Sequence, residues 1–310
     1  MYYYKKSFYK FFFLCFVIAL CIDVFFPYTL YGKAKKSKLP TLAPTTMSIQ
    51  NKSISIGDSI TTLQSRFGKP DRIDKSIYPF DYYVYNTKTY KNFFMIGVQH
   101  NKVVAFYTDA ASFQIGCLTP KCSIRTVNNL LNCKLPSDCN YTFLEKDGLF
   151  YQLFFDQFNQ KKLMGVLLSS VELSQTRNRT NKILRSEERE IFDTCNSARV
   201  RYGLPPLRWS KQTHLISLQH SQDMILHDFF DHTSSNGTPF FKRISKTGTR
   251  FHYAGENIIC GFEDGLSANN GWLNSLSHRV NILGRNFTHS SIGGAAGGTS
   301  HIYFTQDFYG

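Results

Sequence analysis

The stretch GWLNSLSHRVNILG, residues 271–284, decides how this 310-residue chain is interpreted. Apolar and amide side chains fill it, and Gly284 follows the last apolar residue, as glycine commonly follows the end of a helix. The pattern predicts a helix that ends there. Inside it stand His278 and Arg279. The imidazole is a candidate for binding or catalysis as well as for packing, and we expect the guanidinium to pair with a carboxylate.

Further helices and a few strands are expected around this block. Residues HYAGENIICG (252–261) and HIYFTQDFYG (301–310) are strand-like. Start and stop residues such as a serine cap, a proline at the first position and a final glycine bound the helices. Three helices are expected over residues 186–202, 210–226 and 238–247. Helices that alternate with few strands indicate a small sheet covered by helices.

Six sequence blocks in this half occur in an order and at spacings that match a known family. They are NSARVRYGLPPLRWS (196–210), HSQDM (220–224), FFDHTSSNG (229–237), AGENII (254–259), GWLNSLSHRVNIL (271–283) and YFTQDF (303–308). Together they resemble the CAP (SCP) domain of secreted cysteine-rich proteins, venom antigens and plant pathogenesis-related proteins, in its bacterial form. The resemblance implies an α-β-α sandwich with a large cleft.

The first half of the chain has a different pattern. A short helix is expected within IGDSITTLQSRFGKPDRID (56–74), and three strand-like runs follow that helix. The same order recurs 60–66 residues later. We therefore expect a smaller α+β domain with an internal duplication. Its opening block and YYVYN (82–86) resemble the CAP-associated N-terminal domain of Gram-positive bacterial proteins.

The whole chain is accordingly expected to be α+β and to be exported. A lysine-rich start and the apolar run 11–26 are typical of a signal peptide, and the run is short for a spanning helix of about 20 residues. A cleaved leader and a membrane anchor stay open, and both place the rest outside the cytoplasm, secreted or anchored. The expected segments are a leader (1–34), a linker (35–53), the CAP-associated domain (54–172), a second linker (173–185) and the CAP domain (186–310).

Charge and cysteine usage indicate the environment of the protein. The net charge of +14 divides into +6 for residues 1–38, +7 for 39–184 and +1 for 185–310. A basic first half fits an anionic cell-surface polymer or a membrane surface, or a solvated face, and export disfavours nucleic acid. The cysteines between 117 and 139 predict one or two disulfides with three connectivities.

The family resemblance also implies site residues. In eukaryotic members two His and two Glu meet in the cleft and can hold a divalent metal. By motif, His232 matches the first His and Glu256 the first Glu. Ser275 and Tyr303 stand where the second Glu and the second His would be. The bacterial form instead has a His in its HRxNIL block, which is His278 here.

These residues, with Gln306 on the last strand, are the expected lining of a ligand cleft. His232, Glu256 and His278 are the candidate metal ligands and the candidate catalytic residues. Two imidazoles and a carboxylate form a reasonable zinc set with a vacant position for water. A His–Glu pair can also act as general base and orienting group, although the GxSxG nucleophile elbow is missing. The candidate nucleophiles are Ser234, Ser275 and Ser277.

Three functions are compatible with this sequence. The preferred one is an extracytoplasmic, envelope-associated binding module whose cleft holds a small ligand, a peptide or a divalent metal. The alternatives are a metal-dependent or His–Glu assisted hydrolase acting on peptide or cell-wall material, and a lipid or sterol carrier. Binding is preferred to catalysis because half of the eukaryotic His/Glu set is replaced, and because a fold predicts chemistry only weakly.

Overall fold

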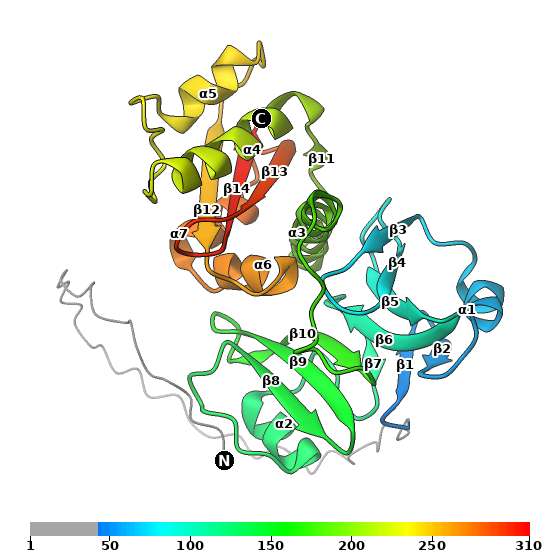
Figure 1. The fold of residues 1–310 in the computed structure, drawn as a ribbon. Coiled ribbons are helices and arrows are strands. Elements are labelled where there is room, and N and C mark those ends of the chain that lie inside the picture. The colour runs from blue at the N-terminus through cyan, green and yellow to red at the C-terminus, as the bar shows by residue number, and fades with distance from the viewer. Residues whose placement is uncertain (1–42) are drawn as a thin grey trace, which may run out of the picture. The chain divides into compact units, whose positions relative to one another are not determined.

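The computed structural model describes residues 43–310 (Figure 1). The predicted leader and the first part of the predicted linker lie outside the described residues. Everything that is described belongs to one compact unit. Within it, every helix is too short or too polar to cross a membrane.

The helices and strands follow one another along the chain as Figure 1 labels them. The helices are α1 (Ile60–Phe67), α2 (Ile124–Leu131), α3 (Asn181–Arg201), α4 (Lys211–Leu226), α5 (Phe240–Lys246), α6 (Gly265–Leu273) and α7 (Leu276–Ile282). The strands before α3 are β1 (Thr46–Ile49), β2 (Lys52–Ser55), β3 (Arg72–Lys75), β4 (Asp81–Tyr85), β5 (Phe94–Gln99), β6 (Lys102–Thr108), β7 (Gln114–Ile115), β8 (Tyr141–Lys146), β9 (Leu149–Asp156) and β10 (Lys162–Ser169). Those after it are β11 (Arg208–Trp209), β12 (Ala254–Cys260), β13 (His289–Ala296) and β14 (Ile302–Tyr309).

A seven-stranded antiparallel sheet forms the first half, in the order β3-β4-β5-β6-β10-β9-β8. The central pair is β6 and β10, with Leu167 opposite Tyr107. Each side of that pair carries one repeat of a helix and three strands, α1 with β4–β6 and α2 with β8–β10. The order of the sheet thus agrees with the duplication expected from the sequence.

The predicted linker over residues 35–53 is wrong at its end. Strand β1 pairs with β2, with Met47 opposite Ile54, and both side chains are fully buried. The segment is rich in Thr, Ser and Pro, so its apolar residues are too few to give a visible period. Two inward side chains in a four-residue strand are nevertheless enough to fix it to the core.

The disulfide prediction is also wrong for the described residues, because all six of their cysteines are free thiols. In the loop after α2, the Cys133 thiol donates to Asn128 Oδ1 at 3.4 Å. The Cys139 thiol donates to the carbonyl oxygen of Tyr141 at 3.1 Å. Asn128 also bonds to the backbone of Leu135, so hydrogen bonds hold this turn-rich stretch.

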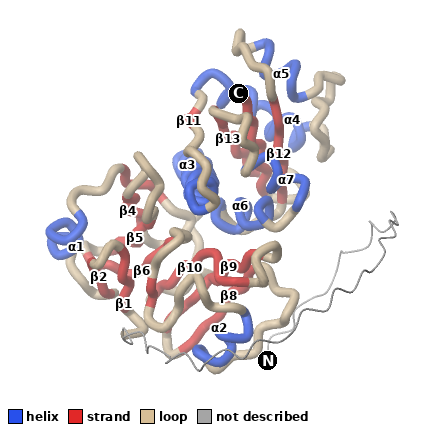
Figure 2. Tube along the Cα trace, turned by 180° about the vertical axis from the view of Figure 1, so that it is seen from behind, coloured by secondary structure: helices blue, strands red, loops and turns tan. Residues whose placement is uncertain are grey.

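The second half is a four-stranded sheet in the order β11-β13-β14-β12, placed between helices. Figure 2 shows β12 and β13 between α3 on one side and α4 on the other. Helix α4 packs directly on β13, because a Cβ atom at Gly293 would lie only 2.0 Å from the backbone nitrogen of Leu218. Trp272 of α6 is fully buried on the other side, in one core with Phe304 and Phe308. This is the expected α-β-α sandwich.

Two element boundaries differ from the prediction. Helix α3 is capped by Thr180, which accepts from the backbone of Ile183 at 3.3 Å, so the second predicted linker ends earlier than residue 185. The helix expected to end at Gly284 is two helices, α6 and α7. Asn274 lies at the break and donates to the carbonyl oxygen of Phe155 at 2.8 Å. A contact with a strand of the first half sets this break.

Candidate ligand cleft

The centre of the site is a hydrogen bond between His232 and Glu256. Glu256 lies on β12, and its carboxylate is fully buried. Its Oε1 accepts from Nδ1 of His232 at 2.8 Å, and the His232 side chain is 49% exposed. The imidazole therefore connects a buried charge to solvent. Its Nε2 has no hydrogen-bond partner within residues 43–310, so this nitrogen is available to a ligand.

Arg243 completes this cluster, and sequence reasoning missed it. It lies on α5, and its Nη2 donates to the second carboxylate oxygen of Glu256. Its Nη1 donates to the carbonyl oxygen of His232 at 2.9 Å and to Ser234 Oγ at 3.1 Å. One guanidinium thus neutralises the buried charge and holds the loop that carries the imidazole. The sequence offered only a basic residue beside the inward Ile244, which is a weak signal.

Asp307 is a second missed residue, and it lies where Gln306 was expected. Asp307 is directly opposite Glu256 in the register of β12 and β14, and it accepts from Ser217 Oγ at 2.6 Å. Burial raises the pKa of Asp307 well above its usual range, and the charge of Glu256 raises it further. The fold therefore favours the neutral form of Asp307. A neutral carboxyl beside Glu256 avoids an unpaired charge in the interior.

Gln306 lies outside the cleft, which corrects the expectation from the sequence. Successive side chains of a strand point to opposite faces, so Gln306 faces away from Glu256 when Asp307 faces towards it. Its amide is buried, and Gln306 acts on the pKa of the Cys195 thiol, which belongs to α3. The α3 side is the far side of the sheet.

His278 reaches the site from α7. Its Nδ1 lies 2.8 Å from Ser275 Oγ, and its backbone carbonyl accepts from Asn257 of β12 at 3.2 Å. Asn281 donates to the backbone carbonyl of Glu256 at 3.1 Å, which fixes α7 beside the carboxylate. Burial lowers the pKa of His278, and the neighbouring charge of His232 lowers it further. The two imidazoles are therefore close enough to interact electrostatically.

Tyr303 is not part of this cluster. It pairs with Cys260, four residues along β14 from Asp307, which corresponds to about 13 Å along a strand. Its ring is buried in a small core with Met224 and Ile258. The residue that aligns with the second family His thus packs in the interior.

A polar pocket of about 350 Å³ adjoins the cluster through Arg243. Hydroxyl and amide groups of the loop before α5 line one side, among them Ser234, Asn236 and Thr238. His220 of α4 lines the other side, with Nε2 at 2.9 Å from the carbonyl oxygen of Asp231. The pocket offers several neutral donors and acceptors, together with the charged groups of Asp223, Arg243 and Lys246.

The residues present do not fit a divalent metal. Both oxygens of Glu256 are taken, one by His232 and the other by the Arg243 guanidinium. Within residues 43–310, no group of three or more His, Cys, Asp or Glu side chains is arranged to hold a metal ion. A cation at this carboxylate would have to displace Arg243, and the resulting charge would be repelled by the guanidinium.

Comparison with known proteins agrees with the two halves of the fold. Residues 56–178 match the CAP-associated N-terminal family, and residues 192–308 match the cysteine-rich secretory protein family, called CAP. The uncharacterized membrane protein YlbC of Bacillus subtilis is 29% identical over 290 residues, which is 82% of each chain. The uncharacterized protein YkwD of the same organism is 35% identical over 124 residues, covering 40% of this chain and 47% of that protein.

Two solved structures share the fold. An extracellular SCP-domain protein from Bacillus anthracis has a TM-score of 0.67 at 26% identity, covering 89% of this chain and 99% of the other. A cysteine-rich secretory protein from Staphylococcus aureus has a TM-score of 0.62 at 15% identity, covering 82% and 91%. The second similarity concerns the fold alone.

Proposed function

Because the chain belongs to the CAP family and carries a CAP-associated N-terminal domain in front of its CAP domain, we propose that it is an extracytoplasmic binding module for short peptides. The peptide occupies the cleft at His232 and His278 together with the adjoining polar pocket. The extracytoplasmic location is supported by two relatives, one described as a membrane protein and one as extracellular.

One observation carries the proposal: a half-exposed imidazole held by a fully buried carboxylate. The 2.8 Å bond from His232 to Glu256 fixes the ring and its tautomer, so Nε2 points away from the carboxylate. A fixed ring loses little conformational freedom when a ligand binds. The cluster is thus pre-organised on the side that faces solvent.

A peptide is the ligand class that the neighbouring groups favour. Hydroxyl and amide side chains such as Ser234 and Asn236 are both donors and acceptors, and they match the alternating groups of a peptide backbone. An acyl chain or a sterol would bury these polar groups without partners, which is unfavourable. The chemistry of this lining therefore supports a peptide rather than a lipid cargo.

Hydrolysis receives less support than binding. Ser275 lies 2.8 Å from His278, but within residues 43–310 no carboxylate orients that imidazole. Ser275 is also the residue at which α7 begins, which is a structural position. Ser234 contacts the Arg243 guanidinium rather than a base. Nucleophilic catalysis uses a nucleophile that is hydrogen-bonded to a base, and a third group that orients this base.

Equilibrium dialysis of the full chain against a mixture of acetylated tripeptide amides tests this function. Mass spectrometry of the retained peptides should show selective enrichment by the unmodified protein. His232→Gln and His278→Ala should abolish it, and His252→Ala, an exposed histidine at the start of β12, should leave it intact. Equal retention by all four proteins would overturn the proposal. Fragments whose masses add up to that of an intact peptide plus one water would establish hydrolysis instead.

A further inference from the structure

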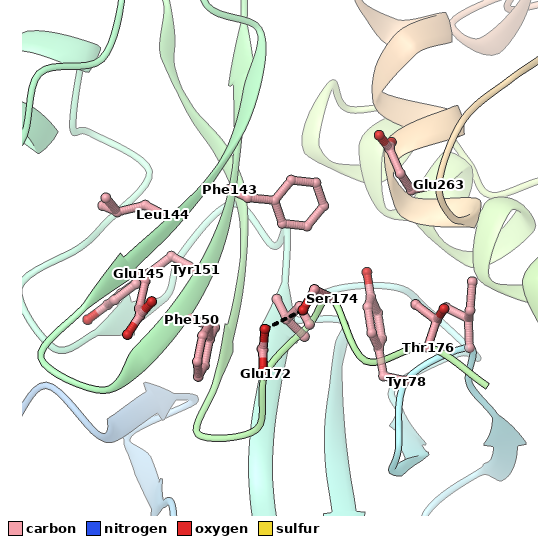
Figure 3. A pocket seen from close by; sticks show the side chains of 12 residues that line it. Tyr78, Phe143, Leu144, Glu145, Phe150, Tyr151, Glu172, Ser174, Thr176 and Glu263 are labelled. Carbon is pink, nitrogen blue, oxygen red and sulfur yellow. Dashed lines mark hydrogen bonds between the residues drawn. The ribbon is translucent and has the colours of Figure 1, made fainter. Parts of the chain in front are cut away.

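A second pocket, unrelated to the histidine cleft, lies beside the β8–β9 hairpin. Its volume is about 410 Å³, which is within the range of about 300–1,000 Å³ found for ligand pockets. Figure 3 shows the rings of Phe143, Phe150 and Tyr78 around it. The hydrogen bond from Ser174 to Glu172 forms another part of its wall. The pocket thus has an aromatic lining and an acidic edge.

The aromatic lining includes a side chain that the fold leaves uncovered. Phe143 is 45% exposed and belongs to β8, an edge strand of the seven-stranded sheet. Tyr78, in contrast, is buried and fixed by a hydrogen bond from its hydroxyl to Asp264. A fixed ring on one side and an open ring on the other form a surface on which an apolar or cationic group can stack.

The charges around the pocket have one sign. The pocket is lined by three carboxylates, those of Glu145, Glu172 and Glu263. Within residues 43–310, its lining includes no Lys, Arg or His. This is unusual for a protein with a net charge of +14. Glu145 is directly opposite Phe150 in the strand register, so its carboxylate stands on the same face as the rings. Neither a salt bridge nor a hydrogen bond engages Glu145 within residues 43–310.

These charges decide the class of ligand. An anionic ligand would be repelled. A purely apolar one would bury the Glu145 carboxylate without compensation, whereas Glu172 accepts from Ser174 and Glu263 accepts from Tyr141. A cation on an apolar stem satisfies both parts of the lining, because aromatic faces attract cations and carboxylates pair with them. We propose that this pocket binds a basic segment of a peptide, in which Lys or Arg stands next to an aromatic residue.

Calorimetric titration of the full chain with acetyl-Lys-Phe-Lys amide tests the proposal. The peptide should bind, and its affinity should fall as salt is added, because the carboxylates are exposed. Acetyl-Glu-Phe-Glu amide should not bind. Butylammonium, a free amine without the peptide, should bind at least about tenfold more weakly, because it lacks the aromatic contact.

Variants assign the binding to this pocket. Phe143→Ser should weaken binding of the lysine peptide about tenfold, and Glu145→Gln with Glu172→Gln about fivefold. Asp147→Asn removes an exposed carboxylate at the turn of the same hairpin and should change nothing. The proposal is overturned if the acidic peptide or butylammonium binds as tightly as the lysine peptide, if no binding occurs, or if Phe143→Ser binds as well as the unmodified protein.

Discussion

Two buried arginine–carboxylate pairs of this protein differ in what completes them. Arg279 of α7 forms a bidentate pair with Asp156 of β9, at 3.1 and 3.0 Å, and Tyr202 closes it from the side. Arg243 pairs with the buried Glu256 through Nη2 alone, and there the last partner is His232, whose side chain is 49% exposed. We call the first pair closed, because buried or partly buried groups surround it. We call the second pair open, because its last partner, His232, is in contact with solvent.

This difference distinguishes a structural ion pair from a candidate site. In both pairs the guanidinium also binds backbone carbonyls, the carbonyl of Leu273 for Arg279 and that of His232 for Arg243. Burial and pairing are therefore common to both and do not by themselves indicate function. The half-exposed imidazole is what only the second pair has.

The largest effect is expected when the closed pair is broken. Arg279→Met leaves the Asp156 carboxylate buried without its ionic partner, and should lower the free energy of unfolding by about 3 to 5 kcal/mol. Urea unfolding followed by circular dichroism measures this change. A loss below about 1 kcal/mol would show that the pair is open to water, contrary to its burial.

A smaller loss is expected from the corresponding change in the open pair. Arg243→Met should cost about 2 kcal/mol, because Glu256 keeps its bond to His232, which can take up a proton from solvent. The same urea experiment compares the two arginine variants directly. If Arg243→Met proved as costly as Arg279→Met, the distinction between an open and a closed pair would be wrong.

The two aspartates should give opposite pH dependences. Hydrogen bonds from Tyr202 and Arg279 outweigh burial and lower the pKa of Asp156, whereas burial and Glu256 raise the pKa of Asp307. The stability that Asp156 contributes is present above its unfolded pKa and is lost in acid. Asp307 in contrast reduces stability as the pH rises above its unfolded pKa, because the folded state retains the proton.

Replacement by asparagine makes this contrast measurable. Relative to the unmodified protein, Asp156→Asn should lose stability at pH 7 and lose less as the pH falls below about 4, where the unfolded aspartate also protonates. Asp307→Asn should gain on the unmodified protein as the pH rises above about 4, by about 1.4 kcal/mol for each pH unit over which the folded carboxyl keeps its proton. Thermal unfolding at a series of pH values records both curves. If the stability of Asp307→Asn and that of the unmodified protein changed in parallel with pH, the raised pKa of Asp307 would be refuted.

The smallest effect on stability is expected at His278, which lies on α7 and is not a member of either pair. His278→Ala should change the free energy of unfolding by less than about 1 kcal/mol, because Ser275 is the one residue among 43–310 to which the side chain bonds. The same variant should abolish retention of acetylated tripeptides. His278→Ala is thus expected to abolish peptide binding while leaving the free energy of unfolding nearly unchanged.

The sequence indicated the fold of the second half and the outer part of its site. His232, Glu256 and His278 were found because each stands in a block whose order and spacing match a family. Arg243 and Asp307 were missed because their roles depend on tertiary contacts. Choosing Asp307 over Gln306 requires knowing which face of β14 meets α4.

The local errors have the same physical origin. The continuous helix expected through residue 274 is broken because the Asn274 side chain bonds to a strand that is distant in the sequence. The strand at Met47 was missed because its pairing, rather than its own apolar period, fixes it. Local sequence patterns predict a helix or strand whose stability comes from its own residues. They fail where a contact with a segment distant in the sequence determines the structure.

The most direct test of the shared cleft is the pKa of the His278 imidazole, measured by NMR titration of the unmodified protein and of His232→Gln. In the unmodified protein this pKa should lie below its ordinary value, because of burial and the charge of His232. It should rise in His232→Gln, since that charge is removed while the burial remains. An unchanged pKa would show that the two imidazoles do not face one space, and would contradict the proposed cleft.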